Sequence, residues 1–205
     1  MIALYHCLSA RSFRPLWALE ELRLPYTLHM LPFPPRAFRK EYLALNPLGT
    51  VPLFIDGDTR MTESPAICHY LAERHAPTTL AVRPDEPAYG AFLNFLSFGE
   101  ATLTFPQALI LRYSQLEADR GLGEVAQDYT RWFAGRLRGI DMAVSDSDYL
   151  CAGRFTAADI SVGYALMLAE ILGLHSHFSP AVAAYWRRLS ARDGYRRALT
   201  AQGTA

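Results

Sequence analysis

The chain has 205 residues, and its 20 Lys and Arg balance 20 Asp and Glu, so its formal net charge is zero. Hydrophobic residues make up 51% of the sequence and charged residues only 20%, which supplies a folded core and excludes a disordered chain. Without an excess of basic residues the chain lacks the electrostatic basis for binding nucleic acid, so a small molecule or a protein is the expected partner. The length allows one large domain or two small ones.

Cysteine usage and hydropathy indicate a soluble, cytoplasmic protein. Cys7, Cys68 and Cys151 are an odd number spread over the chain, which is no disulfide framework. No C-x-x-C pair offers a zinc site, and no metal is predicted. The N-terminal residues lack the basic and apolar regions of a signal peptide. The apolar stretch at 164–174 is shorter than the roughly 20 residues that a membrane span needs.

The first 75 residues alternate between strand and helix patterns. Leu16, Leu19 and Leu22 recur at helical spacing, and Pro25 ends that helix because the residue before proline avoids the α region. Two strand-like runs on either side of Asp56-Gly57 predict a β-hairpin. In chain order we predict a strand at 2–6, a helix at 13–24, a strand at 26–31, a helix at 39–45 after a proline-rich loop, strands at 52–55 and 59–62, and a helix at 64–75.

After a proline-containing linker at 76–87 the strand patterns stop. Pro106 is expected to kink or divide a helix, because it lacks a backbone donor and crowds the preceding turn. Thr156 and Asp159 have the spacing of a capping box, which we interpret as structural. The predicted helical segments are 88–103, 107–117, 125–144, 154–174 and 179–191.

The order of these motifs resembles the glutathione S-transferase superfamily. The residues that carry the resemblance are LYHCLSARSFRPLWALEELRLPY at 4–26, LNPLGTVPLF at 45–54, TESPAICHYL at 62–71 and FTAADISVGYAL at 155–166. The resemblance covers essentially the whole chain. It implies an α/β thioredoxin-like N-terminal domain that binds glutathione, residues 1–77, plus an all-α C-terminal helical domain, residues 88–205.

The Val51-Pro52 motif is the first half of the implied glutathione site. X-Pro bonds lose most of the trans preference, so a cis bond can be held here. A cis turn at the start of a strand would leave the backbone N–H and C=O of Val51 unpaired. In the resembled family these groups bind the cysteinyl part of glutathione, as in strand addition by a peptide. The plain alternative is a proline that merely opens an edge strand.

The second half of the implied site is the helix that follows Glu63. We expect Ser64 to cap this helix and Pro65 to occupy its first position, so that the helix start attracts anions. The resemblance implies that Ser64 holds the γ-glutamyl carboxylate of glutathione and that Glu63 faces its ammonium group. The alternative is an ordinary cap preceded by a solvated acid.

One cation that the family pattern leads us to expect is absent, because Thr50 stands where many relatives have Lys or Arg. The task of binding the glycyl carboxylate then falls to Lys40, Arg39 or Arg11. The plain alternative treats the charges at 36–41 as solvated.

The loop after the first strand should supply a donor to the glutathione sulfur, because the thiolate is the nucleophile. One family pattern assigns this task to Ser9, and another puts Arg11 in place of a cysteine with Ser12 after it. A third pattern places the hydroxyl at Ala10, which has none. Pro15 favours Ser12 as the helix cap, since proline is tolerated in a first turn. We therefore rank Ser9 first, Ser12 second and Cys7 third.

The expected function is that of a glutathione transferase, with glutathione as co-substrate and a small hydrophobic electrophile as the second substrate. The alternatives are a glutathione-dependent isomerase or dehalogenase, and a non-catalytic module that binds a protein partner. The resemblance also implies a homodimer, for which residues 92–96 and 67–70 offer apolar surface. Neither nucleic acid nor a membrane is expected as a partner.

Overall fold

The computed structural model describes residues 1–75 and 77–203. The chain divides into two compact units, of which the second comprises residues 82–190. The first unit comprises residues 1–81 together with the segment that begins at Ala191. The segment that begins at Ala191, which lies within the implied helical domain of residues 88–205, thus groups with the α/β part.

A four-stranded mixed sheet forms the centre of the first unit. Its order is β2-β1-β3-β4, in which β1 runs parallel to β2 and antiparallel to β3, and β3 and β4 form the predicted hairpin. Ile2 pairs with Tyr26 at one end of β1 and Tyr5 with Leu53 at the other. The strands are β1 Ile2–His6, β2 Tyr26–Met30, β3 Leu53–Asp56 and β4 Thr59–Met61.

Helix α1 (Phe13–Leu22) packs against both α3 (Ser64–Arg74) and α9 (Asp193–Gln202). Phe13 and Trp17 are fully buried, and both meet the ring of Tyr195 edge-on. Arg192 joins the two ends of this unit through a bidentate ion pair with Glu21, at 2.8 and 2.9 Å. Apolar and ionic contacts thus hold α9 on α1.

The segment between β2 and β3 differs from its prediction. The proline-rich loop contains a short helix, α2 (Pro35–Phe38), and the helix expected at 39–45 is a 3-10 turn, η1 (Lys40–Ala44). The backbone N–H of Leu45 and that of Asn46 both donate to the carbonyl of Tyr42. Pro47 stops any extension, since the residue before a proline avoids the α region.

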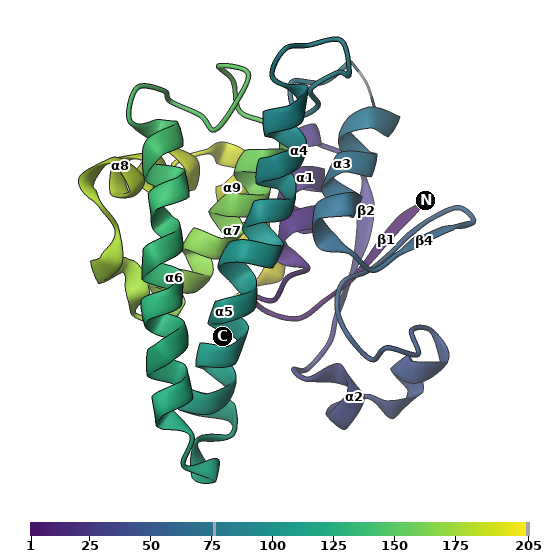
Figure 1. The fold of residues 1–205 in the computed structure, drawn as a ribbon. Coiled ribbons are helices and arrows are strands. Elements are labelled where there is room, and N and C mark those ends of the chain that lie inside the picture. Colours follow the sequence, from purple (N-terminus) through teal and green to yellow (C-terminus); the bar gives the residue numbers. More distant parts are fainter. Residues whose placement is uncertain (76, 204–205) are drawn as a thin grey trace. The chain divides into compact units, whose positions relative to one another are not determined.

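The second unit is helical, and Figure 1 shows α5 and α6 side by side within it. Helix α7 is buried along most of its length, and Gly99 lies so close to it that an added Cβ would stand 2.6 Å from the carbonyl oxygen of Ser161. The α-helices of this unit are α4 Tyr89–Phe98, α5 Phe105–Leu111, α6 Gly123–Val144, α7 Ala157–Ile171 and α8 Pro180–Ser190.

Near Pro106 the helical path changes its type and does not end. A π-helical segment, η2 (Gly99–Thr104), runs directly into α5, and Pro106 is the second residue of α5. A second π-helical segment, η3 (Arg112–Leu116), follows α5.

The predicted capping box at the start of α7 is confirmed. The side chain of Asp159 accepts a hydrogen bond from the backbone N–H of Thr156 at 2.8 Å, and the Thr156 hydroxyl accepts from the N–H of Ala158 at 3.3 Å. Tyr185 donates to the same carboxylate at 2.8 Å. In the part of the chain that the structure describes, no helix is long and apolar enough to cross a membrane.

Candidate active site

Two buried polar side chains fix the peptide group that precedes Val51. The hydroxyl of Tyr42 and the amide nitrogen of Asn46 both donate to the carbonyl oxygen of Thr50, each at 2.8 Å. Asn46 in turn accepts from the backbone N–H of Leu48 at 3.2 Å, which locks its side chain. Because C=O and N–H point in opposite directions in a planar trans peptide, these bonds also fix the direction of the Val51 N–H.

The Val51–Pro52 bond is cis. Among the residues that the structure describes, neither the N–H nor the C=O of Val51 has a hydrogen-bond partner. Pairing between β1 and β3 ends at Leu53, two residues further along the chain. Val51 therefore presents one donor and one acceptor beside the end of a sheet, the pattern that an added peptide strand can satisfy.

Ser64 lies at the start of α3, but not as its cap. The helix begins at Ser64 itself, and Glu63 occupies the cap position with no side-chain capping bond, so the predicted role of Ser64 as N-cap is wrong. The hydroxyl of Ser64 is buried and accepts a hydrogen bond from the guanidinium of Arg14 at 3.1 Å. Since Arg14 supplies the donor in that bond, the hydroxyl proton of Ser64 remains available to an acceptor.

The electrostatic potential at the start of α3 is made positive by two further features, its unpaired backbone N–H groups and the charge of Arg14. Within the described residues, the backbone N–H groups of Ser64 and Ala66 have no hydrogen-bond partner. The fully buried guanidinium of Arg14 adds a full positive charge to the positive end of the helix dipole. The arrangement favours an anion, in particular a carboxylate that can accept from the Ser64 hydroxyl.

The remaining predicted binding residues lie at the surface or in the loop before α1. Glu63 is exposed at the start of α3, and Lys40 is exposed in η1. Arg39 makes an exposed ion pair with Glu41 at 3.0 Å, which agrees with the solvated interpretation of this charged segment. Arg11 is half-buried in the loop between β1 and α1.

Ser9 occupies the third position of a tight turn. The backbone N–H of Ala10 donates to the carbonyl of Cys7 at 3.1 Å, and Ser9 has a φ of 53°, in the left-handed region that non-glycine residues seldom adopt. The backbone N–H of Ser9 donates to Oε1 of Gln202 at 3.0 Å. The last helix of the chain therefore contacts the turn that carries the first-ranked serine.

Ser12 and Cys7 are less accessible than Ser9. Ser12 is fully buried at the N-cap position of α1, yet it makes no capping bond, and its hydroxyl accepts instead from the backbone N–H of Cys7 at 3.4 Å. Cys7 is also fully buried, and its thiol donates to the carbonyl of Pro32 at 3.6 Å. Burial raises the pKa of the Cys7 thiol to about 12, so this residue stays protonated at neutral pH.

Four residues near these groups were missed by the sequence reasoning: Tyr42, Asn46, Arg14 and Gln202. Asn46 stood inside a recognised turn motif, where an Asn side chain that bonds the backbone is a known pattern. Arg14 precedes the apolar stripe of Leu16, Leu19 and Leu22, and only the structure shows that it is buried in α1, where a charge needs a partner. Nothing in the sequence indicated Gln202, whose contacts with His6 and Ser9 span 196 and 193 residues along the chain.

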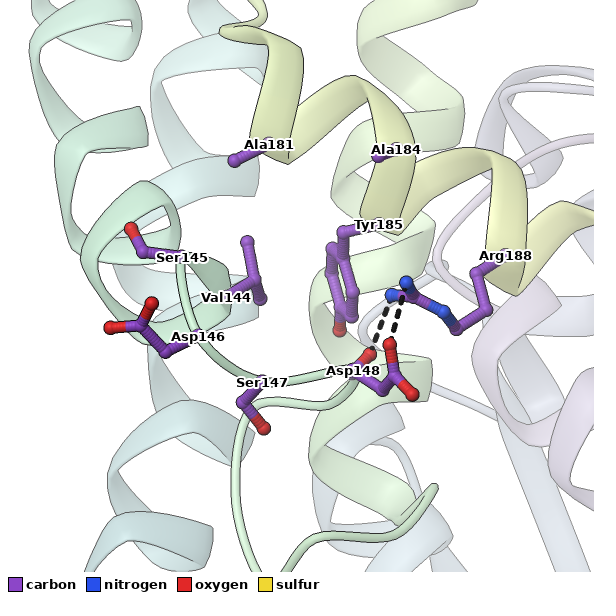
Figure 2. Close-up of a pocket in the computed structure, with 9 residues that line it drawn as sticks. All are labelled: Val144, Ser145, Asp146, Ser147, Asp148, Ala181, Ala184, Tyr185 and Arg188. Carbon is purple, nitrogen blue, oxygen red and sulfur yellow. Dashed lines mark hydrogen bonds and ion pairs between the residues drawn. The ribbon is translucent and has the colours of Figure 1, made fainter.

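A hollow of about 450 Å³ lies in the second unit, between the loop after α6 and helix α8 (Figure 2). Several of its polar groups are engaged within the chain. Arg188 pairs with Asp148 at 2.7 Å, as Figure 2 shows, and the hydroxyl of Tyr185 is directed to Asp159. None of the predicted site residues lies in this unit.

Comparisons with known proteins agree with the fold. A family model described as "Glutathione S-transferase, N-terminal domain" matches residues 8–74. Glutathione S-transferase PM239X14 of Arabidopsis thaliana is 31% identical over 149 residues, which cover 69% of this chain and 68% of that protein. Glutathione S-transferase 3 of Schizosaccharomyces pombe is 25% identical over 184 residues, which cover 83% and 75%.

A solved structure with a similar fold is that of the glutathione transferase URE2P8 from Phanerochaete chrysosporium with oxidized glutathione. It superposes with a TM-score of 0.86 at 20% identity, covering 98% of this chain and 94% of that one.

Proposed function

The chain belongs to the glutathione S-transferase superfamily, as a glutathione transferase with glutathione as its co-substrate, and we propose how its first unit binds the tripeptide and activates the thiol. The observation that carries the proposal is the unpaired backbone of Val51. The N–H and C=O of Val51 would pair with the backbone of the cysteinyl residue of glutathione. Tyr42 and Asn46 support this ladder, because they hold the adjoining peptide group in place.

The γ-glutamyl end of glutathione would lie at the start of α3. Its carboxylate accepts from the Ser64 hydroxyl and from the free backbone N–H groups there, and the buried charge of Arg14 strengthens this binding. Glu63, exposed at the same helix end, is the proposed partner of the ligand's ammonium group. Lys40 or Arg11 is the proposed cationic partner of the glycyl carboxylate.

The Ser9 hydroxyl is the proposed donor to the glutathione sulfur. A hydrogen bond to sulfur stabilises the thiolate more than the thiol and lowers the thiol pKa, so more nucleophile is present at neutral pH. The thiol proton passes to solvent. The thiolate then forms a carbon–sulfur bond to an electrophilic carbon, and the leaving group departs with the electron pair of the bond that breaks.

The second substrate is proposed to be a small apolar electrophile, such as an aryl halide. A related thiol-dependent isomerisation or dehalogenation would use the same activated sulfur. The alternative from a different class is a module that binds a protein partner without turnover. The unpaired donor and acceptor of Val51 and the Arg14–Ser64 pair favour the enzyme, because a module that only binds a protein partner does not require a glutathione site.

Retention on immobilised glutathione, followed by a chromogenic aryl-halide assay, tests the proposal. We expect retention and turnover, and a protein that is not retained would favour the partner-binding module. The Ser9→Ala variant should keep its affinity for glutathione but lose turnover at neutral pH. That loss should shrink as the pH rises toward about 8.5, where a free thiol ionises without help. Ser12→Ala should leave the pH profile unchanged, because its buried hydroxyl serves the Cys7 amide.

We also propose that the protein is a homodimer. The surface that the sequence suggested is smaller than expected, because Phe92, Leu96 and Ile67 are buried inside their own chain. Leu93 is 37% exposed, and Phe95 and Tyr70 are half-buried. Light scattering should report twice the chain mass of 23.0 kDa at micromolar concentration, and the mass of a single chain would contradict the dimer.

A further inference from the structure

Gln202, near the C-terminal end of α9, contacts the turn of Ser9 from a distance of 193 residues along the chain. Its side-chain oxygen lies 3.0 Å from the backbone nitrogen of Ser9 and 3.1 Å from Nε2 of His6. Gln202 is 7% exposed and His6 is fully buried. One oxygen therefore binds the end of β1 and the turn that follows it.

The chemistry of the donors fixes the orientation of this amide. A backbone N–H can only donate, so the atom of Gln202 that faces Ser9 is the oxygen. Since that oxygen can only accept, His6 must carry its proton on Nε2. Burial lowers the pKa of His6 to about 4, so the ring is neutral at neutral pH and holds a single proton. The three groups thus form one defined arrangement.

The turn needs such support. Ser9 has a Cβ and a positive φ, a combination that costs free energy and persists where surrounding contacts impose it. The hydrogen bond from Ser9 N–H to Gln202 is a contact at that very residue. Its loss removes one of the contacts that hold Ser9 at a positive φ, and a shift of the backbone toward a negative φ would change the direction of the side chain.

We propose that Gln202 is a positioning residue of the active site, which holds the Ser9 hydroxyl in the direction that serves the glutathione sulfur. This inference rests on the proposed role of Ser9. Gln202 itself touches no substrate in this account. It acts through the backbone of Ser9. Removing the Gln202 acceptor should therefore lower kcat/KM in the same way as removing the Ser9 hydroxyl, and the two losses of kcat/KM should not be additive.

A double-mutant cycle tests the inference. Gln202→Met keeps the length of the side chain and removes the acceptor. We expect it to lower kcat/KM at neutral pH by about ten- to a hundredfold, the cost of a misplaced catalytic group. The loss should shrink at higher pH, as for Ser9→Ala, and the Kd of glutathione in calorimetry should be unchanged. In the Ser9→Ala background, Gln202→Met should change neither kcat nor the pH profile.

Three further measurements separate positioning from general stability. Gln202→Glu keeps an acceptor oxygen and should restore most of the activity that Gln202→Met loses. Thr200→Ala, an exposed position on the same helix, should behave as the parent protein. Amide hydrogen exchange at Ser9 should be faster in Gln202→Met than in the parent, while exchange in β1 is retained. If Gln202→Met unfolds the protein, Gln202→Asn, whose amide falls short by one methylene, should give the same changes in weaker form.

The outcomes distinguish the two proposals. If Ser9→Ala leaves the pH profile unchanged, the proposed role of Ser9 is wrong, and the positioning role falls with it. If Ser9→Ala shifts the profile while neither Gln202→Met nor Gln202→Asn does, only the inference about Gln202 is overturned. An equal loss from Gln202→Met in both backgrounds would also overturn it, since the effect would then not pass through the Ser9 hydroxyl.

Discussion

The guanidinium of Arg14 donates to the hydroxyl of Ser64 across 3.1 Å, and both side chains are buried. The pair joins the first turn of α1 to the first turn of α3. It gives the start of α3 a full charge in addition to the helix dipole, and it orients the hydroxyl that we propose for the γ-glutamyl carboxylate.

Ser64→Ala should therefore weaken glutathione binding. The variant removes a donor to a charged ligand group and leaves Arg14 without this partner, and we expect a loss of about 1–3 kcal/mol in binding free energy. Calorimetry measures the Kd. Ser176→Ala, at an exposed position of the second unit, is the control. An unchanged Kd for Ser64→Ala would refute this placement of the carboxylate.

Tyr42→Phe should weaken glutathione binding, and Asn46→Ala should weaken it more. Tyr42→Phe keeps the ring and removes one of two hydrogen bonds to the Thr50 carbonyl. Asn46→Ala removes the other and also the bond to Leu48, so the Val51 peptide loses more of its support. We expect about 1 kcal/mol of binding free energy for the first and more for the second. Equal Kd values for both variants and the parent would show that Val51 needs no such support.

His6 should make the protein less stable below neutral pH. Burial lowers its folded-state pKa to about 4, whereas the unfolded chain takes up this proton near pH 6.5. The stability is therefore fully present above about pH 6.5 and is lost as the pH falls toward 4, by about 3 kcal/mol over the whole range.

Denaturant unfolding of the parent and of His6→Gln between these pH values measures this contribution. Gln keeps a neutral N–H donor toward Gln202 and does not titrate. Burial raises the pKa of Asp159, which acts in the opposite direction, but it does so in both proteins. The free energy of unfolding of the parent should fall more steeply than that of the variant. Parallel curves would contradict the assigned pKa of His6.

Gly194→Ala should loosen α9 from α1. An added Cβ would stand 2.6 Å from Oε1 of Glu21, and that carboxylate cannot move away because Arg192 and Trp17 hold it. We expect a loss of about 1–3 kcal/mol in the free energy of unfolding, as for other overpacked sites. Gly90→Ala is the matched control, since a Cβ there meets nothing within 4 Å. Equal stability of the two variants would refute this account.

Local patterns in the sequence predicted the sheet well. The strand at 2–6 and the hairpin around Asp56-Gly57 depend on residue alternation and turn chemistry, which are local. The same holds for the Thr156 capping box. The 3-10 turn at Lys40–Ala44 was predicted as a helix, because residues 39–45 have helical composition, whereas Pro47 prevents the helix from extending.

The non-local contacts could not be predicted. The ion pair of Glu21 with Arg192 spans 171 residues, and no periodicity connects the two. For the same reason the assignment of α9 to the first unit did not follow from the sequence. Within the site, residue types suggested Ser9, Val51 and Ser64, whereas the contact of Gln202 with the backbone of Ser9 became visible only in three dimensions.

The first unit contains both β1 and α9, so its chain is interrupted by the whole of the second unit. On the ribosome, the sheet and α1 emerge early, whereas Gln202 is added only after residues 82–190 have been made. Domains generally fold in the order in which they are synthesised. We therefore expect the turn of Ser9 to reach its final form last, although it is among the first residues translated. An unfinished chain would then hold the Val51 backbone, which we propose binds glutathione, without an ordered turn at Ser9.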